Sequence, residues 1–372
     1  LSLNWQQFIL IASVLVVIFL ALTNITRYPK PWFDEGSHLH VPKTLVKYGV
    51  YADYSSEGFR YYGPTIGVGP TVMLPIAGVF KLFGIGLLQA RIVIVVYMLL
   101  AIFVFYRLVL GLSGSFWLTL VACALLLSSR SVLFINYGRQ VLGEVPGFFF
   151  IIAGIGLWFA SWEDNGWKRL WVVGLLVGLA MITKYQYLLF LLPMIVIMWI
   201  LNIIYYKTVS NKNIVIPGIV AGICFAIWQG ITIISLGPAT AMENIALLRA
   251  SAESAAFTFN LAQIGRNFGE LATRSVFMGA LIPAIVYGFI VSIPRNSEAQ
   301  KWGVLYLLVV LNLGWYVIAS IGWIRYAFLG LALSTIFIAK LFYDATSGFK
   351  INLEGSRGIH AVRSIIDRNH AY

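Results

Sequence analysis

Long apolar runs recur along almost the whole chain, with short polar segments between them. A helix of about 20 apolar residues crosses a bilayer core of about 30 Å, and most of the runs approach that length. Their positions predict helices at residues 6–26, 90–109, 115–133, 145–161, 168–183, 186–206, 214–236, 272–292, 302–321 and 324–343. We therefore predict an all-α polytopic membrane protein with about ten transmembrane helices.

One apolar segment, residues 70–84, differs from these runs. It is short, it contains Pro75, and it carries Lys81 near its end. We expect a helix that lies at the membrane interface or re-enters the membrane without crossing it. With this segment left out and the N-terminus placed inside, most basic residues between helices fall on the cytoplasmic side, as the positive-inside rule requires.

The composition supports a membrane domain and excludes a separate soluble one. Hydrophobic residues make up 60% of the 372 residues and charged residues 11%, which is far from the usage of soluble globular domains. We predict a transmembrane domain at residues 1–343 and a basic cytoplasmic tail at 344–372. The first apolar stretch has no small-residue cleavage site after it, so we expect it to be retained as a helix.

The two cysteines give no sign of a disulfide framework. Cys123 and Cys224 both lie inside apolar runs, where free cysteine behaves as a small apolar residue. The chain is expected in the plasma (inner) membrane as a multi-pass protein. Its net charge of +12 does not indicate a nucleic-acid partner, because the basic residues form no single stripe and no nucleic-acid module is visible.

The predicted topology collects the unusual polar residues on the non-cytoplasmic face. A first outer loop spans residues 27–89, and a second spans 237–271. The first opens with "FDEGSH", which contains Asp34 and Glu35, and His38 and His40 follow closely. Carboxylates at a membrane edge need partners, because they gain little from extending toward water.

The rest of the first outer loop is expected to lie along the membrane. Residues 41–54 form an amphipathic stretch, and a Pro/Gly-rich turn with Tyr61 and Tyr62 follows it. A metal site formed by the two acids with His38 and His40 is an alternative that we disfavour, because no other helix supplies an obvious His or Cys ligand. We predict no metal-binding residues and no required cofactor, and leave a divalent cation open.

Cations lie at predicted helix ends on the same outer face. Those that suggest a shared task are Arg91, Arg139, Lys184 and Arg325. Most terminal Lys and Arg residues simply anchor helix ends at the interface. We expect that ordinary role for Arg130, Arg249, Arg266 and Arg274.

An acid pair facing several cations suits transfer from a phosphate-activated donor. A phosphate leaving group departs without being protonated, so cations are needed to hold its developing charge. One carboxylate is needed to take the proton of the attacking hydroxyl. A donor reached from within a helical bundle is most naturally a lipid phosphate.

Several motifs, in this order along the chain, resemble the polytopic GT-C glycosyltransferases. They are "FDEGSH", "RQVLGEVP", "GLAMITKYQYLLFLLP" and the late "GWIRYAFLGLAL". The resemblance is to the protein O-mannosyltransferases and the aminoarabinose transferases of lipid A, and it covers roughly residues 8–200 together with the late Arg-Tyr. It implies a GT-C-type bundle, amphipathic helices in the first outer loop, and a polyprenyl-phosphate sugar donor.

The resemblance also implies roles for individual residues. Asp34 matches the general base, and Glu35 is its catalytic neighbour. The expected donor-phosphate ligands are Arg91, Lys184, Arg139 and Arg325. The expected substrate-binding residues are Glu144, Tyr61, Tyr62 and His38.

These observations predict an inverting glycosyltransferase. It would move a hexose or pentose from a polyprenyl-phosphate carrier to a hydroxyl of a lipid, glycan or protein acceptor on the outer face. A transporter or flippase of lipid-linked sugars is one alternative, although we find no convincing internal repeat. A non-catalytic GT-C-like subunit of a membrane complex is another, although the chain keeps the acid pair.

Overall fold

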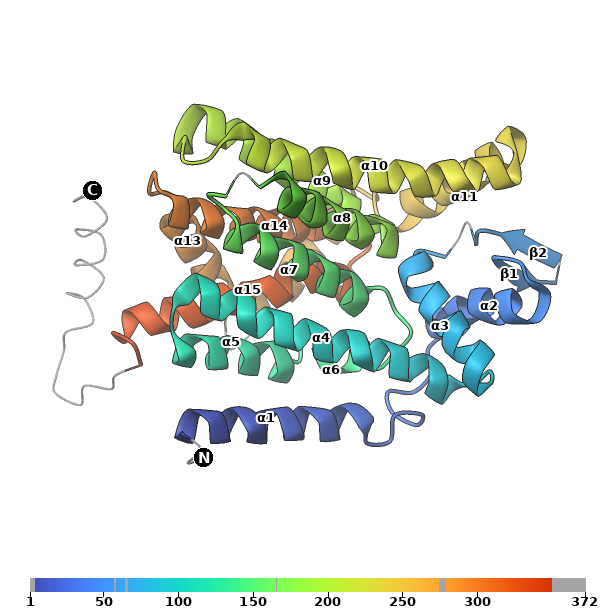
Figure 1. Ribbon diagram of the computed structural model, residues 1–372, viewed down its shortest axis with the longest axis horizontal. Helices are drawn as coiled ribbons and strands as arrows, with labels where there is room; N and C mark the ends of the chain where they lie inside the picture. The colour runs from blue at the N-terminus through green and yellow to red at the C-terminus, as the bar shows by residue number, and fades with distance from the viewer. Residues whose placement is uncertain (1–3, 57, 64–65, 165, 274–278, 350–372) are drawn as a thin grey trace.

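A computed structural model describes residues 4–56, 58–63, 66–164, 166–273 and 279–349. It is a bundle of long helices with smaller elements at one end (Figure 1). The bundle helices are α1 (Trp5–Leu22), α4 (Leu87–Ser113), α5 (Phe116–Ser128), α7 (Glu144–Ala160), α8 (Trp167–Thr183), α9 (Leu188–Leu201), α10 (Asn211–Leu236), α13 (Leu281–Ser292), α14 (Ser297–Ala319) and α15 (Phe328–Ala345).

Each of the ten predicted spans overlaps one of these helices, with ends that differ by a few residues in most cases. Within the described ranges, six continuous helical stretches are long and apolar enough to cross a bilayer, and the others are shorter. Two of the six are extended at their ends. The 3₁₀ turn η1 (Tyr185–Tyr187) and the π-helical turn η2 (Asn202–Tyr206) flank α9, and the 3₁₀ turn η3 (Ile324–Ala327) precedes α15. The prediction of a helical polytopic membrane protein is confirmed.

The segment predicted as the first outer loop, and called by that name below, folds into small elements. They are α2 (Phe33–Tyr48), the hairpin β1 (Ala52–Ser55) and β2 (Gly58–Tyr61), and α3 (Pro70–Phe83). The hairpin is antiparallel, with Ala52 opposite Tyr61. The expected amphipathic stretch 41–54 is therefore only partly helical, because α2 stops at Gly49, whose left-handed backbone forms its C-cap. The helix expected at 70–84 is present as α3.

The segment predicted as the second outer loop is mostly helical, although its sequence pattern predicts a loop. It contains α11 (Pro238–Ala255) and α12 (Leu261–Thr273). Proline at the first helical position and a run of Ala, Leu, Glu and Arg explain why α11 is helical. The span predicted at 272–292 was too long, because α13 begins only at Leu281.

The small elements gather at one end of the bundle. Figure 1 shows α2, α3, the hairpin and α11 together at that end, whereas α1 begins and α15 finishes at the opposite end. The predicted tail at 344–372 lies outside the described residues from 350 onward. The two predicted outer loops, which are far apart in sequence, therefore lie at the same end of the bundle.

The bundle has a buried centre and lipid-facing flanks. Helix α8 packs between α7 and α10, and α7 packs on α4. Every residue of α15 from Phe328 to Ala339 is buried, whereas α1 buries only Ala21. The exposed side chains of α1 and α10 are largely apolar, as expected for helices whose outer faces contact lipid.

Candidate active site

Asp34 lies in the first turn of α2 and forms an ion pair with Arg325 of η3. Their side chains are 22% and 19% exposed, so both remain accessible. A carboxylate in the first turn of a helix is favoured by the helix dipole. The pair joins the first outer segment to the start of α15.

Glu144 and Lys184 form a second ion pair beside the first. Glu144 is the first residue of α7, and Lys184 is the C-cap of α8. Burial lowers the pKa of Lys184, and the neighbouring Glu144 carboxylate opposes this effect. The Tyr187 hydroxyl donates a 2.7 Å hydrogen bond to the main-chain oxygen of Glu144, which ties η1 to the start of α7.

The two pairs belong to one group of interacting charges. Arg325 interacts electrostatically with both Glu144 and Lys184, and Asp34 interacts with Lys184. His38 lies one turn further along α2 than Asp34. It interacts electrostatically with Glu144, Asp34 and Lys184. We call these five residues, Asp34, His38, Glu144, Lys184 and Arg325, the outer cluster.

His38 is held as a neutral donor within the outer cluster. Its Nδ1 donates a 2.6 Å hydrogen bond to the main-chain oxygen of Val141. Burial lowers the pKa of His38, and the Val141 carbonyl partly opposes that shift. The imidazole is therefore uncharged near neutral pH, and it positions α2 without adding a charge to the cluster.

Glu35 and Arg91 form a separate, fully buried pair. Arg91 Nε and Nη2 donate to the two carboxylate oxygens of Glu35 at 2.8 and 2.6 Å, and the residues are 0% and 1% exposed. Glu35 also accepts from the Val141 amide at 3.0 Å, and Arg91 Nη1 donates to the Ile25 oxygen at 2.5 Å. Most of the hydrogen-bonding capacity of Arg91 is thus used within the protein.

Val141 is the point at which α2 docks. Its amide donates to Glu35 and its carbonyl accepts from His38. Glu35 and His38 are three residues apart, so they share one face of α2. This docking fixes α2 with Asp34 directed at Arg325 and not at Val141.

Close packing fixes α3 against the end of α8. The Gly69 amide donates to the Thr183 oxygen at 2.9 Å, and the hydroxyls of Thr71 and Thr183 are 2.6 Å apart. A Cβ atom at Gly69 would overlap the main-chain oxygen of Ile182. The backbone next to Lys184 is therefore held rigidly by α3.

Tyr61 and Tyr62 lie near the second outer segment. The Tyr61 main-chain oxygen accepts from Asn244 of α11 at 3.2 Å, and its side chain is half-exposed. The Tyr62 ring packs against Trp228 of α10, with 5.8 Å between ring centroids. Trp228 Nε1 in turn donates a 3.0 Å hydrogen bond to the hydroxyl of Tyr185. Tyr185 is the residue after Lys184 in the chain.

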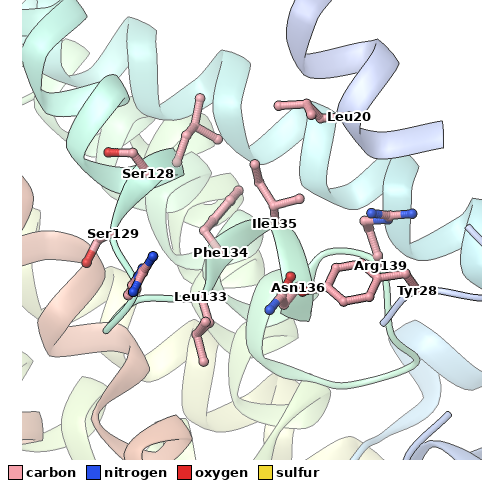
Figure 2. Close-up of a pocket in the computed structure, with 11 residues that line it drawn as sticks. Leu20, Tyr28, Ser128, Ser129, Leu133, Phe134, Ile135, Asn136 and Arg139 are labelled. Carbon is pink, nitrogen blue, oxygen red and sulfur yellow. The ribbon is translucent and has the colours of Figure 1, made fainter. Parts of the chain in front are cut away.

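Arg139 is not joined to the outer cluster by any described contact. Its guanidinium donates to the Thr23 oxygen and lies 5.7 Å from the Tyr28 ring centroid. It lines a pocket between α1 and the segment that precedes α7 (Figure 2). The four expected phosphate ligands therefore divide, with Lys184 and Arg325 beside Asp34 and the other two elsewhere.

The two histidines of the first outer loop are directed to different partners. His40 Nδ1 donates to the Tyr54 oxygen at 3.0 Å, whereas His38 bonds to Val141. Over the described part of the chain, no three His, Cys, Asp or Glu side chains gather closely enough to hold a metal ion. The absence of a required cofactor stays a prediction.

The arginines expected to act as anchors have varied surroundings. Arg249 pairs with Glu253 on exposed turns of α11, and Arg266 donates to Gln263 at 2.6 Å. Arg274 lies outside the described residues. Arg130 lines the same pocket as Arg139.

Comparison with known proteins supports this architecture. Residues 68–229, less than half of the chain, match the family described as dolichyl-phosphate-mannose-protein mannosyltransferase. ArnT from Cupriavidus metallidurans, in a structure bound to undecaprenyl phosphate, superposes with a TM-score of 0.61 at 14% identity over 90% of this chain. The chain has the fold of the GT-C glycosyltransferases.

A second GT-C structure is also similar. The archaeal oligosaccharyltransferase AglB from Archaeoglobus fulgidus, in complex with an inhibitory peptide and a dolichol-phosphate, gives a TM-score of 0.55 at 12% identity over 99% of this chain. The chain spans 59% of the length of ArnT and 55% of that of AglB. No curated protein matches the chain by sequence.

Proposed function

We propose that this GT-C protein transfers a sugar from a polyprenyl-phosphate donor to an acceptor hydroxyl, with Asp34 as general base. The observation that carries the proposal is the outer cluster, in which an accessible carboxylate lies against Arg325 and close to Lys184. Glu35 and Glu144 are buried and paired, so they are poorly placed to meet an acceptor. Asp34 is the carboxylate of the outer cluster that substrates can reach.

The transfer is a single displacement. The acceptor oxygen attacks the anomeric carbon and forms the new glycosidic bond, and the bond from that carbon to the phosphate oxygen breaks. The bonding electrons leave with the phosphate, and the acceptor proton goes to Asp34. One displacement inverts the anomeric configuration.

Lys184 and Arg325 are proposed to hold the phosphate as its charge develops. They come from the end of α8 and the start of α15, and cations fixed in advance stabilise a departing anion without reorganisation. Binding of the phosphate would draw Arg325 away from Asp34 and so release the base. Glu144, His38, Tyr61 and Tyr62 are proposed to contact substrate or to shape its site.

We assign Glu35 and Arg91 a positioning role. Their buried pair locks α2 to α4, and α2 carries Asp34. This assignment revises the expectation that Arg91 binds the donor phosphate. The contacts that support it are the two hydrogen bonds to Glu35 and the one to Ile25.

The nature of the donor rests on the structural neighbours. ArnT is bound to undecaprenyl phosphate and AglB to a dolichol-phosphate, so a polyprenyl-phosphate carrier is the donor class that we propose here. A lipid, glycan or protein hydroxyl is the proposed acceptor. We place the reaction on the non-cytoplasmic face of the plasma (inner) membrane and without a required cofactor, a divalent cation being open to test by adding EDTA.

The test is the substitution Asp34→Asn in purified protein. Removing the proton acceptor should lower the transfer of labelled sugar by about 10²–10⁴-fold. Donor binding should be kept, because Lys184 and Arg325 remain. Asp164→Asn is the matched control, since Asp164 lies in the turn between α7 and α8 and forms an exposed pair with Arg169 of α8.

Two outcomes would count against the proposal. Full transfer by Asp34→Asn would remove Asp34 as base. The flippase alternative would be favoured if the unsubstituted protein transferred no sugar but moved lipid-linked sugar across vesicle membranes. Asp34→Asn would then move it at the same rate.

A further inference from the structure

A pocket of about 260 Å³ lies between the end of α1 and the segment that joins α5 to α7. Figure 2 shows Leu20 of α1 on one side and Asn136 and Arg139 on the other. Its polar lining consists of Tyr28, Ser128, Ser129, Arg130, Asn136 and Arg139. No acidic residue lines it, so its charge is positive.

Arg139 is the buried cation of this pocket. It is 5% exposed, and its Nε has no hydrogen-bond partner. Its described contacts are the Thr23 oxygen and the Tyr28 ring, neither of which is an anion. A buried guanidinium edge without a partner is costly, so Arg139 favours an anion close to it.

Arg130 supplies a second cation to the same pocket. Its side chain is exposed, and no carboxylate pairs with it among the described residues. Asn136 adds an amide donor to the lining. Two arginines and a neutral donor form the kind of lining that binds a phosphate, because guanidinium groups match phosphate oxygens with parallel hydrogen bonds.

The position of the pocket identifies the source of the phosphate. Its wall includes Leu20 near the end of α1, and both Leu20 and the adjacent Phe19 are exposed on the apolar surface of that helix. An occupant with acyl chains can lay them along α1, whereas a free anion gains nothing from that surface. The volume admits a headgroup and leaves the chains outside.

We propose that this pocket binds the phosphate headgroup of an acidic membrane lipid, at a site separate from the outer cluster. Arg139 would meet the phosphate from the buried side, and Arg130 from the exposed side. The site would therefore hold a lipid beside α1 while the donor phosphate occupies Lys184 and Arg325. The proposal depends on the pocket alone and not on the transfer reaction.

The experiment is photo-crosslinking of the purified full chain in detergent. The probe is phosphatidic acid with a diazirine in one acyl chain, and the crosslinked peptides are mapped by mass spectrometry. We expect crosslinks at the end of α1 and at residues 127–139, saturating with lipid concentration. Phosphatidylcholine with the same photoreactive chain should crosslink there much more weakly, because its choline offsets the phosphate charge.

Arg130→Gln is the decisive variant, because an exposed side chain can be changed without disturbing the fold. Loss of one charge-assisted contact should raise the lipid concentration needed for half-maximal crosslinking by about tenfold. Arg107→Gln is the matched control, since Arg107 is also exposed but lies near the far end of α4. Arg139→Lys keeps the buried charge but loses the guanidinium fork, and it should give an intermediate effect.

Two results would overturn the proposal. Equal crosslinking in the Arg130→Gln and unsubstituted proteins would remove the pocket as the site. Competition by inorganic phosphate at the concentration at which soluble short-chain phosphatidic acid competes would show a free-anion site and not a lipid site. Neither measurement depends on sugar transfer, so a failure here is distinct from a failure of the proposed enzyme.

Discussion

At the scale of single residues, two acid–arginine pairs of the same chemistry differ in exposure. Asp34 and Arg325 are each about one-fifth exposed, whereas Glu35 and Arg91 are buried. An exposed pair can exchange partners with a substrate. A buried pair holds structure, and removing one member leaves an uncompensated charge.

We therefore expect Arg91→Ala to destabilise the protein by about 3–5 kcal/mol. Thermal unfolding in detergent, followed by tryptophan fluorescence, would measure this loss. The double variant Glu35→Leu/Arg91→Met should recover much of it, because an apolar pair leaves no buried charge. Arg249→Ala, at an exposed pair on α11, should leave the unfolding temperature unchanged.

The same experiment tests the role that the sequence predicted for Arg91. If Arg91→Ala unfolds at the normal temperature but binds the polyprenyl phosphate poorly, the donor role stands and the positioning role fails. Stability and donor binding should therefore be measured on one preparation.

His38 gives a prediction about pH. Burial holds its pKa below the ordinary value of 6.5, so the folded protein takes up this proton less readily than the unfolded chain. The contribution of His38 to stability is present above about pH 6.5 and is lost as pH falls from there toward the folded pKa, by up to about 1.4 kcal/mol per pH unit.

His38→Gln should reduce this loss, so that the unfolding temperature falls less between pH 7.5 and pH 5.5 than in the unsubstituted protein. His40→Gln is the control, since His40 bonds to Tyr54 and is not one of the outer cluster. An identical pH slope in the His38 variant would contradict the assignment.

The sequence predicted which residue types form the site better than it predicted their partners. Asp34, Lys184 and Arg325 were expected on one face, and the structure brings them together with Glu144 and His38. The pairing itself depends on which helices are neighbours, and local pattern carries no such information. The hydrogen bond from Tyr187 to Glu144 was missed for that reason, although Tyr187 follows Lys184 by three residues.

At the scale of elements, the contact between α3 and α8 fixes the position of Lys184 at the end of α8. Gly69→Ala should lower stability by about 1–3 kcal/mol, because the new methyl group meets a main-chain oxygen that cannot rotate away. Transfer should fall as well, since the end of α8 moves. Gly67→Ala is the matched control, because a Cβ atom at Gly67 meets nothing within 4 Å.

The outcome can be read from unfolding and transfer assays in parallel. Equal stability of the Gly67 and Gly69 variants would mean that α3 and α8 separate easily. The docking would then have no part in positioning Lys184.

Elements were predictable where one physical signal dominated. Long apolar runs gave the positions of α4, α10 and α14, because bilayer thickness sets their length. The sequence pattern predicts a loop where α11 and α12 lie, because neither helix has such a run. Their helical state follows from residue propensity and from contacts such as that of Asn267 with the main-chain oxygens of Tyr316 and Ser320.

At the scale of the whole molecule, the orientation in the membrane is a prediction that labelling can test. Single cysteines at Lys81 of α3 and Ser251 of α11 should react with an impermeant maleimide added to intact cells. A cysteine at Asp164, in the turn at the other end of the bundle, should react only after the cells are opened. All three positions are exposed in the structure.

The labelling needs a background without native cysteines. Cys123 and Cys224 are both free and half-buried, so serine or alanine can replace them without breaking a disulfide. Lys184 is a poorer reporter than Ser251, because it is 12% exposed and paired. Labelling of Asp164→Cys from outside intact cells would reverse the proposed orientation.

The Asp34–Arg325 pair joins residues 291 positions apart. At about 5–20 residues per second, a ribosome makes them about 15–60 s apart. Throughout that interval Asp34 is already synthesised but its partner does not yet exist. A chain interrupted before η3 therefore carries the carboxylate without the arginine, and translation itself delays the site until nearly the whole bundle has been inserted.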